Sequence, residues 1–348
     1  MPPGRPIRLD HAAAVRGDAL SRAALAFARS RFDPSSSPLE HARRAFAGDR
    51  AVELIVRAAS APASPTTSGW ADVLAHVSTV FFASLVGPSA AADVFVRGLR
   101  VNFDGVGAIA LPLIAVGSAS FVGTGKPIPV TQFATASGVK LEPHKLALIS
   151  VLTREMVESS NAEAIVGAAL KESASYGLDA AFFSASAGTA DAPAGILNGV
   201  AALTPSTNAD TWAAMISDLS AIGGAVARVA GSDVVFVAAP EQALAVALRA
   251  PDFGPVLASR ALPAKTVVAV AANAVASGFD SAPVIEASRE TELLLDTAPG
   301  EIVPQGGSLT YPTGTLFQGD KLALKMRMEA GWTLRAPNTV AWMSSVSW

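Results

Sequence analysis

The strongest constraint on the fold is a long helical pattern over residues 162–184. At 1.5 Å per residue this segment predicts a rod of roughly 35 Å. Ser160 or Asn161 can cap its first turn, and a short helical turn over residues 154–158 precedes it. Apolar and small side chains recur at the spacing of one helical face, which we expect to pack: Ile165, Ala169, Tyr176, Ala180 and Phe183.

Strands are predicted on both sides of this helix in the sequence. Residues 146–152 form an apolar run, and residues 101–116 also favour strands. The clearest alternation covers residues 321–328, where Leu322, Leu324, Met326 and Met328 would face a core and the residues between them water. We expect a turn at Gly331 and a return strand over residues 332–335. The chain is therefore predicted to have an α+β fold.

The region between residues 201 and 312 reads as a small α/β unit. Asp210 is placed to cap a helix, and Pro240 opens another that ends near residue 248. Buried strands are expected at residues 233–237, 266–270 and 283–285. The first of the two helices carries one apolar side: Trp212, Met215, Leu219, Ile222 and Val226.

Residues 1–60 form a separate, basic segment. They contain ten Arg against six Asp and Glu, a local balance of +4 within a chain of net charge -3. Helices are expected at residues 10–31 and 38–58, separated by a breaker at residues 33–38 and followed by a flexible linker at residues 61–69. Such a segment could meet an anionic partner or form a solvated helical appendage.

Residues 118–140 predict a protruding β-hairpin. The stretch is rich in Gly, Ser and Thr and contains few large apolar side chains. A hairpin alone is marginally stable in water, so we expect a second copy of the chain to cover it. Its main apolar anchors, and the lysine among them, are the expected contact residues: Phe121, Lys126, Ile128, Val130 and Phe133.

Composition excludes several classes of site. The chain has no cysteine, and its four histidines lie far apart, so no disulfide, thiolate centre or histidine metal site is expected. Charged residues make up 16%, well below the roughly 25% of ordinary soluble domains. No cofactor is predicted. Glu155 and Glu158 could form an acid–base pair, although solvated or inter-subunit charges are the alternative.

Two further patterns fail as functional motifs. Gly123 and Lys126 resemble part of a phosphate-binding loop, but Ser120 replaces its first glycine and Pro127 its hydroxyl residue. Residues 105–125 carry no charge but include Pro112 and short apolar runs, so we expect a strand followed by a loop and no membrane span.

The order of several short motifs resembles the major capsid proteins of tailed phages, of the Hong Kong 97 (HK97) type, together with their prophage and gene-transfer-agent relatives. The resemblance extends from about residue 67 to the C-terminus. The motifs are TSGW at 67–70, GTGKPIP at 123–129, LEPHKLA at 141–147, LTREM at 152–156, PAGIL at 193–197, LFQGD at 316–320, and the closing strand that ends at RAP, 335–337.

The resemblance implies a division of the chain into named parts. These are a helical N-terminal extension that may be scaffold-like (1–64), an N-terminal arm with the start of the peripheral domain (65–117), an extended loop (118–142), a peripheral domain with a spine helix (143–200), an axial domain (201–312) and closing strands of the peripheral domain (313–348). In several relatives the extension is removed during maturation, and an unprocessed extension is the alternative.

The resemblance also implies a function. The chain would be a structural subunit, not an enzyme, that forms pentamers and hexamers and closes into an icosahedral shell around phage double-stranded DNA. It would assemble in the bacterial cytoplasm with a portal, a maturation protease and decoration proteins, and would reside in the virion without membrane contact. Some relatives join a loop lysine to an asparagine, but Asp320 stands near that position, so no cross-link through Lys126 is expected. The alternatives are an encapsulin-like nanocompartment shell and a soluble hydrolase.

Overall fold

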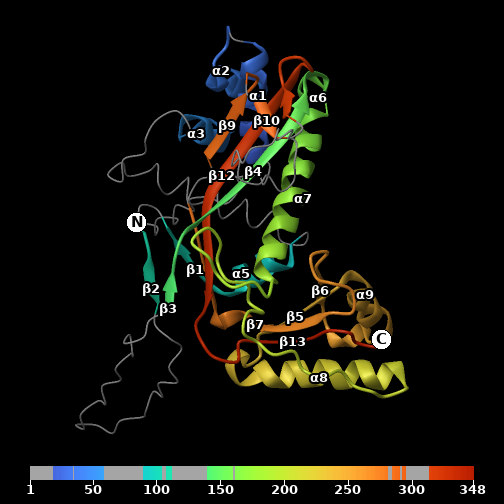
Figure 1. The fold of residues 1–348 in the computed structure, drawn as a ribbon. Coiled ribbons are helices and arrows are strands. Elements are labelled where there is room, and N and C mark those ends of the chain that lie inside the picture. Colours follow the sequence, from blue (N-terminus) through green and yellow to red (C-terminus); the bar gives the residue numbers. More distant parts are fainter. Residues whose placement is uncertain are drawn as a thin grey trace, which may run out of the picture. The chain divides into compact units, whose positions relative to one another are not determined.

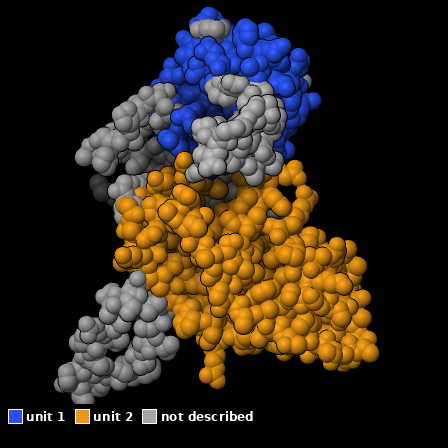
Figure 2. Space-filling view, in the orientation of Figure 1, with its two compact units in different colours: residues 1–81, 147–170, 281–328 blue, residues 82–146, 171–280, 329–348 orange. Residues whose placement is uncertain are grey.

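The computed structural model describes residues 19–33, 35–58, 89–103, 107–111, 139–159, 161–280, 284–290, 292–294 and 313–348 (Figure 1). The chain divides into two compact units (Figure 2). Unit 1 comprises residues 1–81, 147–170 and 281–328, and unit 2 comprises residues 82–146, 171–280 and 329–348. Each unit therefore combines segments that are far apart in the sequence.

Helices and strands are mixed along the chain, so the predicted α+β fold is confirmed. The α-helices are α1 (Ala19–Phe32), α2 (Pro38–Ala45), α3 (Arg50–Ala58), α5 (Ala90–Arg97), α6 (Arg154–Glu158), α7 (Ala162–Phe182), α8 (Thr211–Ala230) and α9 (Pro240–Arg249), with short 3-10 turns η2 (Pro251–Phe253) and η3 (Ala272–Ala274). The strands are β1 (Leu99–Asn102), β2 (Ile109–Leu111), β3 (Val139–Leu141), β4 (His144–Thr153), β5 (Val234–Ala238), β6 (Val256–Ala258), β7 (Val267–Ala271), β8 (Val275–Phe279), β9 (Val284–Ser288), β10 (Glu292–Leu294), β11 (Thr313–Thr315), β12 (Lys321–Leu334) and β13 (Val340–Met343).

The N-terminal helices of unit 1 differ from the sequence prediction at one point. The expected helix over residues 38–58 is two helices, α2 and α3, because Gly48 adopts a positive φ of 85° that ends the first. Asp49 then accepts a hydrogen bond from the Val52 N–H in the first turn of α3. At the start of α2, Ser37 and Glu40 form a reciprocal capping box, as the breaker at residues 33–38 allows.

The closing strand β12 is longer than predicted. Leu322, Leu324, Met326 and Met328 are buried as expected, but Ala323, which was expected to face water, is buried as well. The predicted turn at Gly331 is wrong, since β12 continues without a break to residue 334. A Cβ on Gly331 would lie 2.2 Å from the carbonyl oxygen of Glu142, so the glycine permits a close backbone approach and not a reversal.

Within the five-stranded sheet the order is β1-β8-β12-β4, with β9 also paired to β12. In unit 1, β9 runs antiparallel to the first half of β12, and the cross-strand pair Lys325–Glu286 (2.7 Å) lies at this register. In unit 2, β8 pairs with the second half of β12 and with the parallel strand β1. Neither α5 nor β8 was expected from the sequence.

An aromatic cluster forms one core of unit 2. The ring of Phe95 on α5 lies edge-on to Phe182 at 4.7 Å and stacks on Trp332 at 5.8 Å. The indole N–H of Trp332 donates to the carbonyl oxygen of Ala194 at 2.9 Å. A Cβ on Gly195 would lie 2.0 Å from the Ser184 carbonyl oxygen, so the PAGIL motif is a tight turn packed onto this core.

The second core of unit 2 contains two of the three strands expected in the small α/β unit, β5 and β7. The third, expected at residues 283–285, is β9, which pairs with β12 in unit 1. The sheet of this second core has the order β13-β7-β5-β6, and α8 packs against β7 and β13 (Figure 1). Met215, Leu219, Ile222 and Val226 of α8 are buried there, whereas Trp212 is exposed. Strand β13 comes from the C-terminal part of the chain and pairs antiparallel with β7.

α8 is also the one helix in the described part of the chain that is long and apolar enough to cross a membrane. Its buried face and the buried Asp218, which accepts a hydrogen bond from Trp348, are features of a core helix.

Candidate functional site

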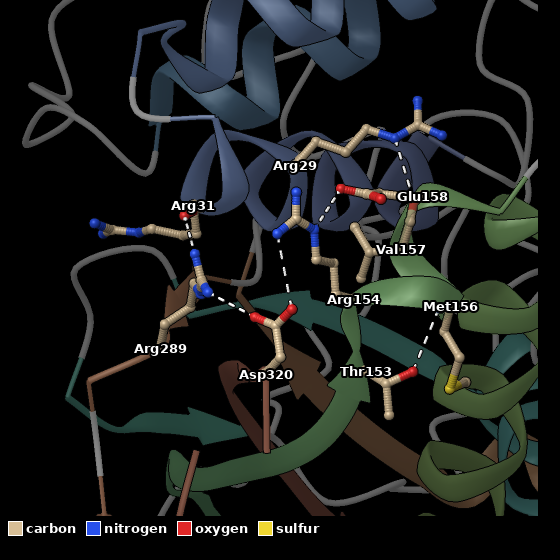
Figure 3. Close-up of polar contacts among 9 residues, drawn as sticks. All are labelled: Arg29, Arg31, Thr153, Arg154, Met156, Val157, Glu158, Arg289 and Asp320. Carbon is tan, nitrogen blue, oxygen red and sulfur yellow. Dashed lines mark hydrogen bonds and ion pairs between the residues drawn. The ribbon is translucent and has the colours of Figure 1, made fainter. Parts of the chain in front are cut away.

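Several polar interactions of unit 1 involve Asp320, which lies at the start of β12 (Figure 3). Its φ of 46° places it in the left-handed region at the turn into the strand. One carboxylate oxygen accepts from the Arg289 guanidinium at 2.7 Å, and the other lies 3.8 Å from the guanidinium of Arg154. Its carbonyl oxygen accepts from the Arg154 N–H at 3.2 Å. Asp320 thus joins the start of β12 to α6 and to the residue that follows β9.

The carboxyl end of α1 lies against the same two arginines. Arg289 donates to the carbonyl oxygen of Arg31 at 3.3 Å, and its guanidinium carbon lies 4.4 Å from the centre of the Phe32 ring. Arg154 lies over the same ring at 5.6 Å. Cations stabilise the negative end of a helix and the face of an aromatic ring. We call Arg154, Arg289, Asp320 and Phe32 the arginine cluster.

The electrostatics of this region do not suit acid–base chemistry. Glu158 bonds the Arg154 guanidinium at 2.7 Å, and this hydrogen bond raises the pKa of the arginine. The pKa of Glu155 is lowered by its own backbone N–H and by the Thr153 hydroxyl. A general acid near neutral pH needs the opposite shift. Glu155 therefore behaves as a surface charge on α6, as in the alternative interpretation, and Glu158 is paired with Arg154.

Asp320 is also the residue that the family resemblance places near a cross-linking asparagine. In the structure it is held by two arginines, so its carboxylate has a structural partner on each oxygen. Lys126 lies outside the described residues, as do the other expected loop contacts, Phe121, Ile128, Val130 and Phe133. Strands β2 and β3, which flank residues 112–138, pair antiparallel.

The spine helix is present as α7, but the face picked from the sequence is not the one that it buries in its own chain. Ile165 is 40% exposed, Tyr176 is 57% exposed, and Ala180 is also exposed. Ala169 is half-buried, and Phe183, just past the helix, is buried. The buried stripe of α7 consists of other residues: Val166, Leu170, Ala174, Leu178 and Phe182.

Sequence reasoning missed the most strongly bonded acid, Asp179 of α7 in unit 2. Its carboxylate accepts from the hydroxyls of Ser89 and Ser259, each at 2.6 Å, and from the N–H groups of Ala90 and Ala91 at 3.2 and 3.0 Å. The site ties α7 to the first turn of α5 and to the segment after β6. The one feature of the sequence that could have indicated this site is the single acid in an otherwise apolar helical turn.

No metal site is found in the described part of the chain, where no three His, Asp or Glu side chains converge. A hollow of about 900 Å³ in unit 1 borders the arginine cluster and is lined by serines of the α1–α2 connection, by Arg289 and by Phe317. The hydroxyl of Ser35, one of the lining residues, donates a hydrogen bond to the Asp33 carboxylate. The arginine cluster beside the hollow links segments that are far apart in the sequence.

Comparison with known proteins gives one sequence match. Residues 96–265 match the sequence model of the phage capsid family. The matched region includes α6, α7, α8, α9 and the PAGIL turn. Three members of the arginine cluster lie outside it: Phe32, Arg289 and Asp320. No curated protein matches the chain.

Several solved capsid structures are similar to the chain. One is from Microbacterium phage Oxtober96, with 15% identity, a TM-score of 0.46, and coverage of 74% of this chain and 90% of that chain. The satellite phage P4 procapsid including the size determination (Sid) protein gives 10% identity, a TM-score of 0.47, and coverage of 78% and 91%. The capsid of a native GTA particle has 13% identity and a TM-score of 0.43, and the match covers 74% of this chain and 91% of that chain. Because these identities are low, the assignment rests on the sequence match.

Proposed function

We propose that the chain is the major shell subunit of a tailed-phage or prophage capsid, which assembles through pentamers and hexamers into an icosahedral shell around double-stranded DNA. The observation that carries the proposal is the capsid-family match over residues 96–265. The subunit would assemble in the bacterial cytoplasm, together with a portal, a maturation protease and decoration proteins, and would reside in the virion.

Exposed apolar side chains support a role in a packed assembly. On α9 of unit 2, Leu244 and Leu248 lie one helical turn apart and are 60% and 74% exposed. On β4 of unit 1, Ile149 and Val151 share one exposed face. Contiguous apolar surface of this kind marks interaction sites, and a low fraction of charged residues fits a subunit surrounded by copies of itself.

We further propose that residues 118–142 form the extended loop that lies over a neighbouring subunit. Its apolar anchors Phe121, Ile128, Val130 and Phe133 would each contribute roughly 1.5–3 kcal/mol if a neighbour buried them fully. A broad-specificity protease should then cut this segment in free subunits and spare it in shells. Equal protection in both states would mean that the segment packs within its own chain.

Mature shells are proposed to lack a covalent link between Lys126 and Asp320. Boiled shells should then run as single subunits on a denaturing gel. A ladder of multimers would show the proposal wrong, because the chain has no cysteine to form disulfides.

An encapsulin-like compartment shell is the alternative with the same assembly. The phage-type PAGIL turn, which packs on the aromatic core through Trp332 and Ala194, favours the phage assignment. A soluble hydrolase is the other alternative. The pKa of Glu155, one of the two acids on α6, is lowered, which is the wrong direction for a general acid near neutral pH.

Negative-stain electron microscopy of the expressed full-length chain tests the proposal. Rings or closed shells are expected. The paired variants Leu244→Asp and Leu248→Asp should reduce assembly, whereas Glu172→Gln, at an exposed position of α7, serves as a matched surface control. Fields containing only compact monomers at every salt concentration and pH would overturn the shell assignment.

A further inference from the structure

Helix α1 is buried as deeply as a core element of unit 1. Nine of its 14 residues are buried, including Leu20 and Leu25. It contacts α2 and α3 as well as β9 and α6. A helix at the surface of a domain has one apolar stripe and one wet face. Because α1 is covered by elements from both ends of the sequence, it completes the core of the unit.

Arg22 joins three helices at the amino-terminal half of α1. Its guanidinium donates to Glu163 of α7 at 2.6 Å and to Asp49, just before α3, at 2.9 Å. The side chain is 16% exposed, and the hydrogen bond to Glu163 is the main reason that its pKa is raised. Because the largely buried guanidinium bonds two carboxylates in defined directions, it holds the segments that carry them in place as well as balancing their charge.

The backbones of α1 and α7 also approach closely. A Cβ built on Gly167 would lie 2.9 Å from the Ser21 hydroxyl oxygen and 3.3 Å from the Ser21 Cβ. Glycine in the middle of a helix costs roughly 1 kcal/mol relative to alanine. The docking of α1 gives a physical reason for this glycine, whereas Gly177 of the same helix has nothing within 4 Å.

The other end of α1 is held by the arginine cluster (Figure 3). Arg289 bonds the Arg31 carbonyl oxygen, and Arg29 of α1 donates to the carbonyl oxygen of Val157 at 3.4 Å. Phe32 lies beneath Arg289. α1 is thus fixed to distant parts of the sequence at its start, along its length and at its end.

We propose that α1–α3 are a permanent part of the folded subunit, held by these non-covalent contacts, so that cutting the chain between residues 58 and 89 does not release them. Removing them would uncover the partners of Leu20 and Leu25 and leave Glu163 without its arginine. The three helices would therefore remain bound to the rest of the subunit after such a cut. This inference does not depend on the proposed function.

The first test uses the full-length chain with a recognition sequence for a site-specific protease inserted within residues 61–69. After complete cutting, confirmed on a denaturing gel, the N-terminal fragment should co-elute with the remainder in native size exclusion. It should separate only in denaturant. A fragment that elutes on its own in native buffer would overturn the inference.

The second test compares two glycines of α7 by hydrogen exchange of the α1 amides. Gly167→Leu should speed exchange in residues 19–32 by about tenfold or more, because the new side chain displaces Ser21. Gly177→Leu, with open space around it, should leave that exchange unchanged. The milder Gly167→Ala should be relieved by Ser21→Gly, which removes the atoms that it meets.

Unchanged α1 exchange in Gly167→Leu would mean that α1 is not docked at this position. Failures of the two proposals can be separated. Chains that retain the cut fragment but never form shells would refute only the capsid function. Chains that form shells after losing the fragment would refute only the permanent docking of α1–α3.

Discussion

The two units join distant segments of the chain by different chemistry. In unit 1 the long-range polar contacts are arginine–carboxylate pairs, and the side chains of Arg289 and Asp320 are 26% and 46% exposed. Unit 2 also has exposed pairs, such as Glu172 with Arg260, but its buried acids accept from neutral donors: Asp179 and Asp218 are 3% and 2% exposed. Exposed ion pairs are weakened by salt, whereas buried hydrogen-bonded groups are not.

This difference predicts that ionic strength should act mainly on unit 1. Asp179 sits at the positive end of α5, where two backbone N–H groups and the Ser89 hydroxyl converge on it. The groups that donate to Asp179 are uncharged hydroxyl and backbone N–H groups. Added salt should therefore weaken these hydrogen bonds little.

Asp179→Ala should lower the free energy of unfolding by about 4 kcal/mol, because each buried donor left without an acceptor costs roughly 1–3 kcal/mol. Urea denaturation measures the loss, which should be the same at low and high salt. Glu172→Ala in the same helix removes an exposed pair with Arg260 and should cost no more than about 0.5 kcal/mol. Equal costs for the two variants would remove the contrast between the units.

Trp348→Phe should cost about 1.5 kcal/mol, since Asp218 would lose the indole N–H that donates at 2.9 Å and keep only the Ser206 N–H. Trp212→Phe at the start of the same helix should change stability by no more than about 0.5 kcal/mol, because Trp212 is exposed. Thermal unfolding of the two variants compares them directly. A neutral Trp348→Phe would mean that Asp218 does not need this donor.

Arg289→Ala should cost about 1 kcal/mol at low salt through the lost contacts to Asp320, Arg31 and Phe32. The cost should shrink in 1 M sodium chloride. Arg327→Ala, an exposed arginine on β12, is the matched control and should have almost no effect. If salt did not change the loss of unfolding free energy in Arg289→Ala, the ion pairs of unit 1 would be no more sensitive to salt than the buried hydrogen bonds of unit 2.

The smallest effect concerns Glu286 on β9, whose pKa is lowered chiefly by the hydrogen bond from Lys325. A lowered folded-state pKa stabilises the protein above the ordinary carboxyl pKa, and this contribution disappears as pH falls through the folded value. Glu286→Gln should therefore remove a small acid-dependent loss of stability below about pH 4.5. Measuring unfolding between neutral and acidic pH checks it, and an unchanged pH profile would contradict it.

Elements with a single regular period were predictable from the sequence. The alternation of Leu322, Leu324, Met326 and Met328 predicted the buried face of β12, and Asp210 was placed correctly as the cap of α8. Helix caps and the alternation of side chains along a strand depend only on residues a few positions apart. A single sequence therefore contains enough information to predict them. The α/β arrangement around α8 followed from the same signals.

The errors occur where contacts with distant residues decide the outcome. Gly331 carries the same local signal as a turn glycine, but it permits the approach of the Glu142 backbone. α7 has small or apolar residues on every side, so Ile165 and Val166 could not be ranked without knowing what covers them. The partners of Asp179 and Asp320 come from segments about 80 or more and about 30 or more residues away, beyond any local pattern.

Sedimentation velocity of the purified full-length chain, over a range of protein concentrations, tests whether the chain assembles as a shell subunit. A shell subunit predicts large, discrete species that grow at the expense of the monomer as concentration rises, and that Leu244→Asp with Leu248→Asp suppresses. A single monomeric boundary at all concentrations, identical in the wild-type chain and the variant, would contradict the account.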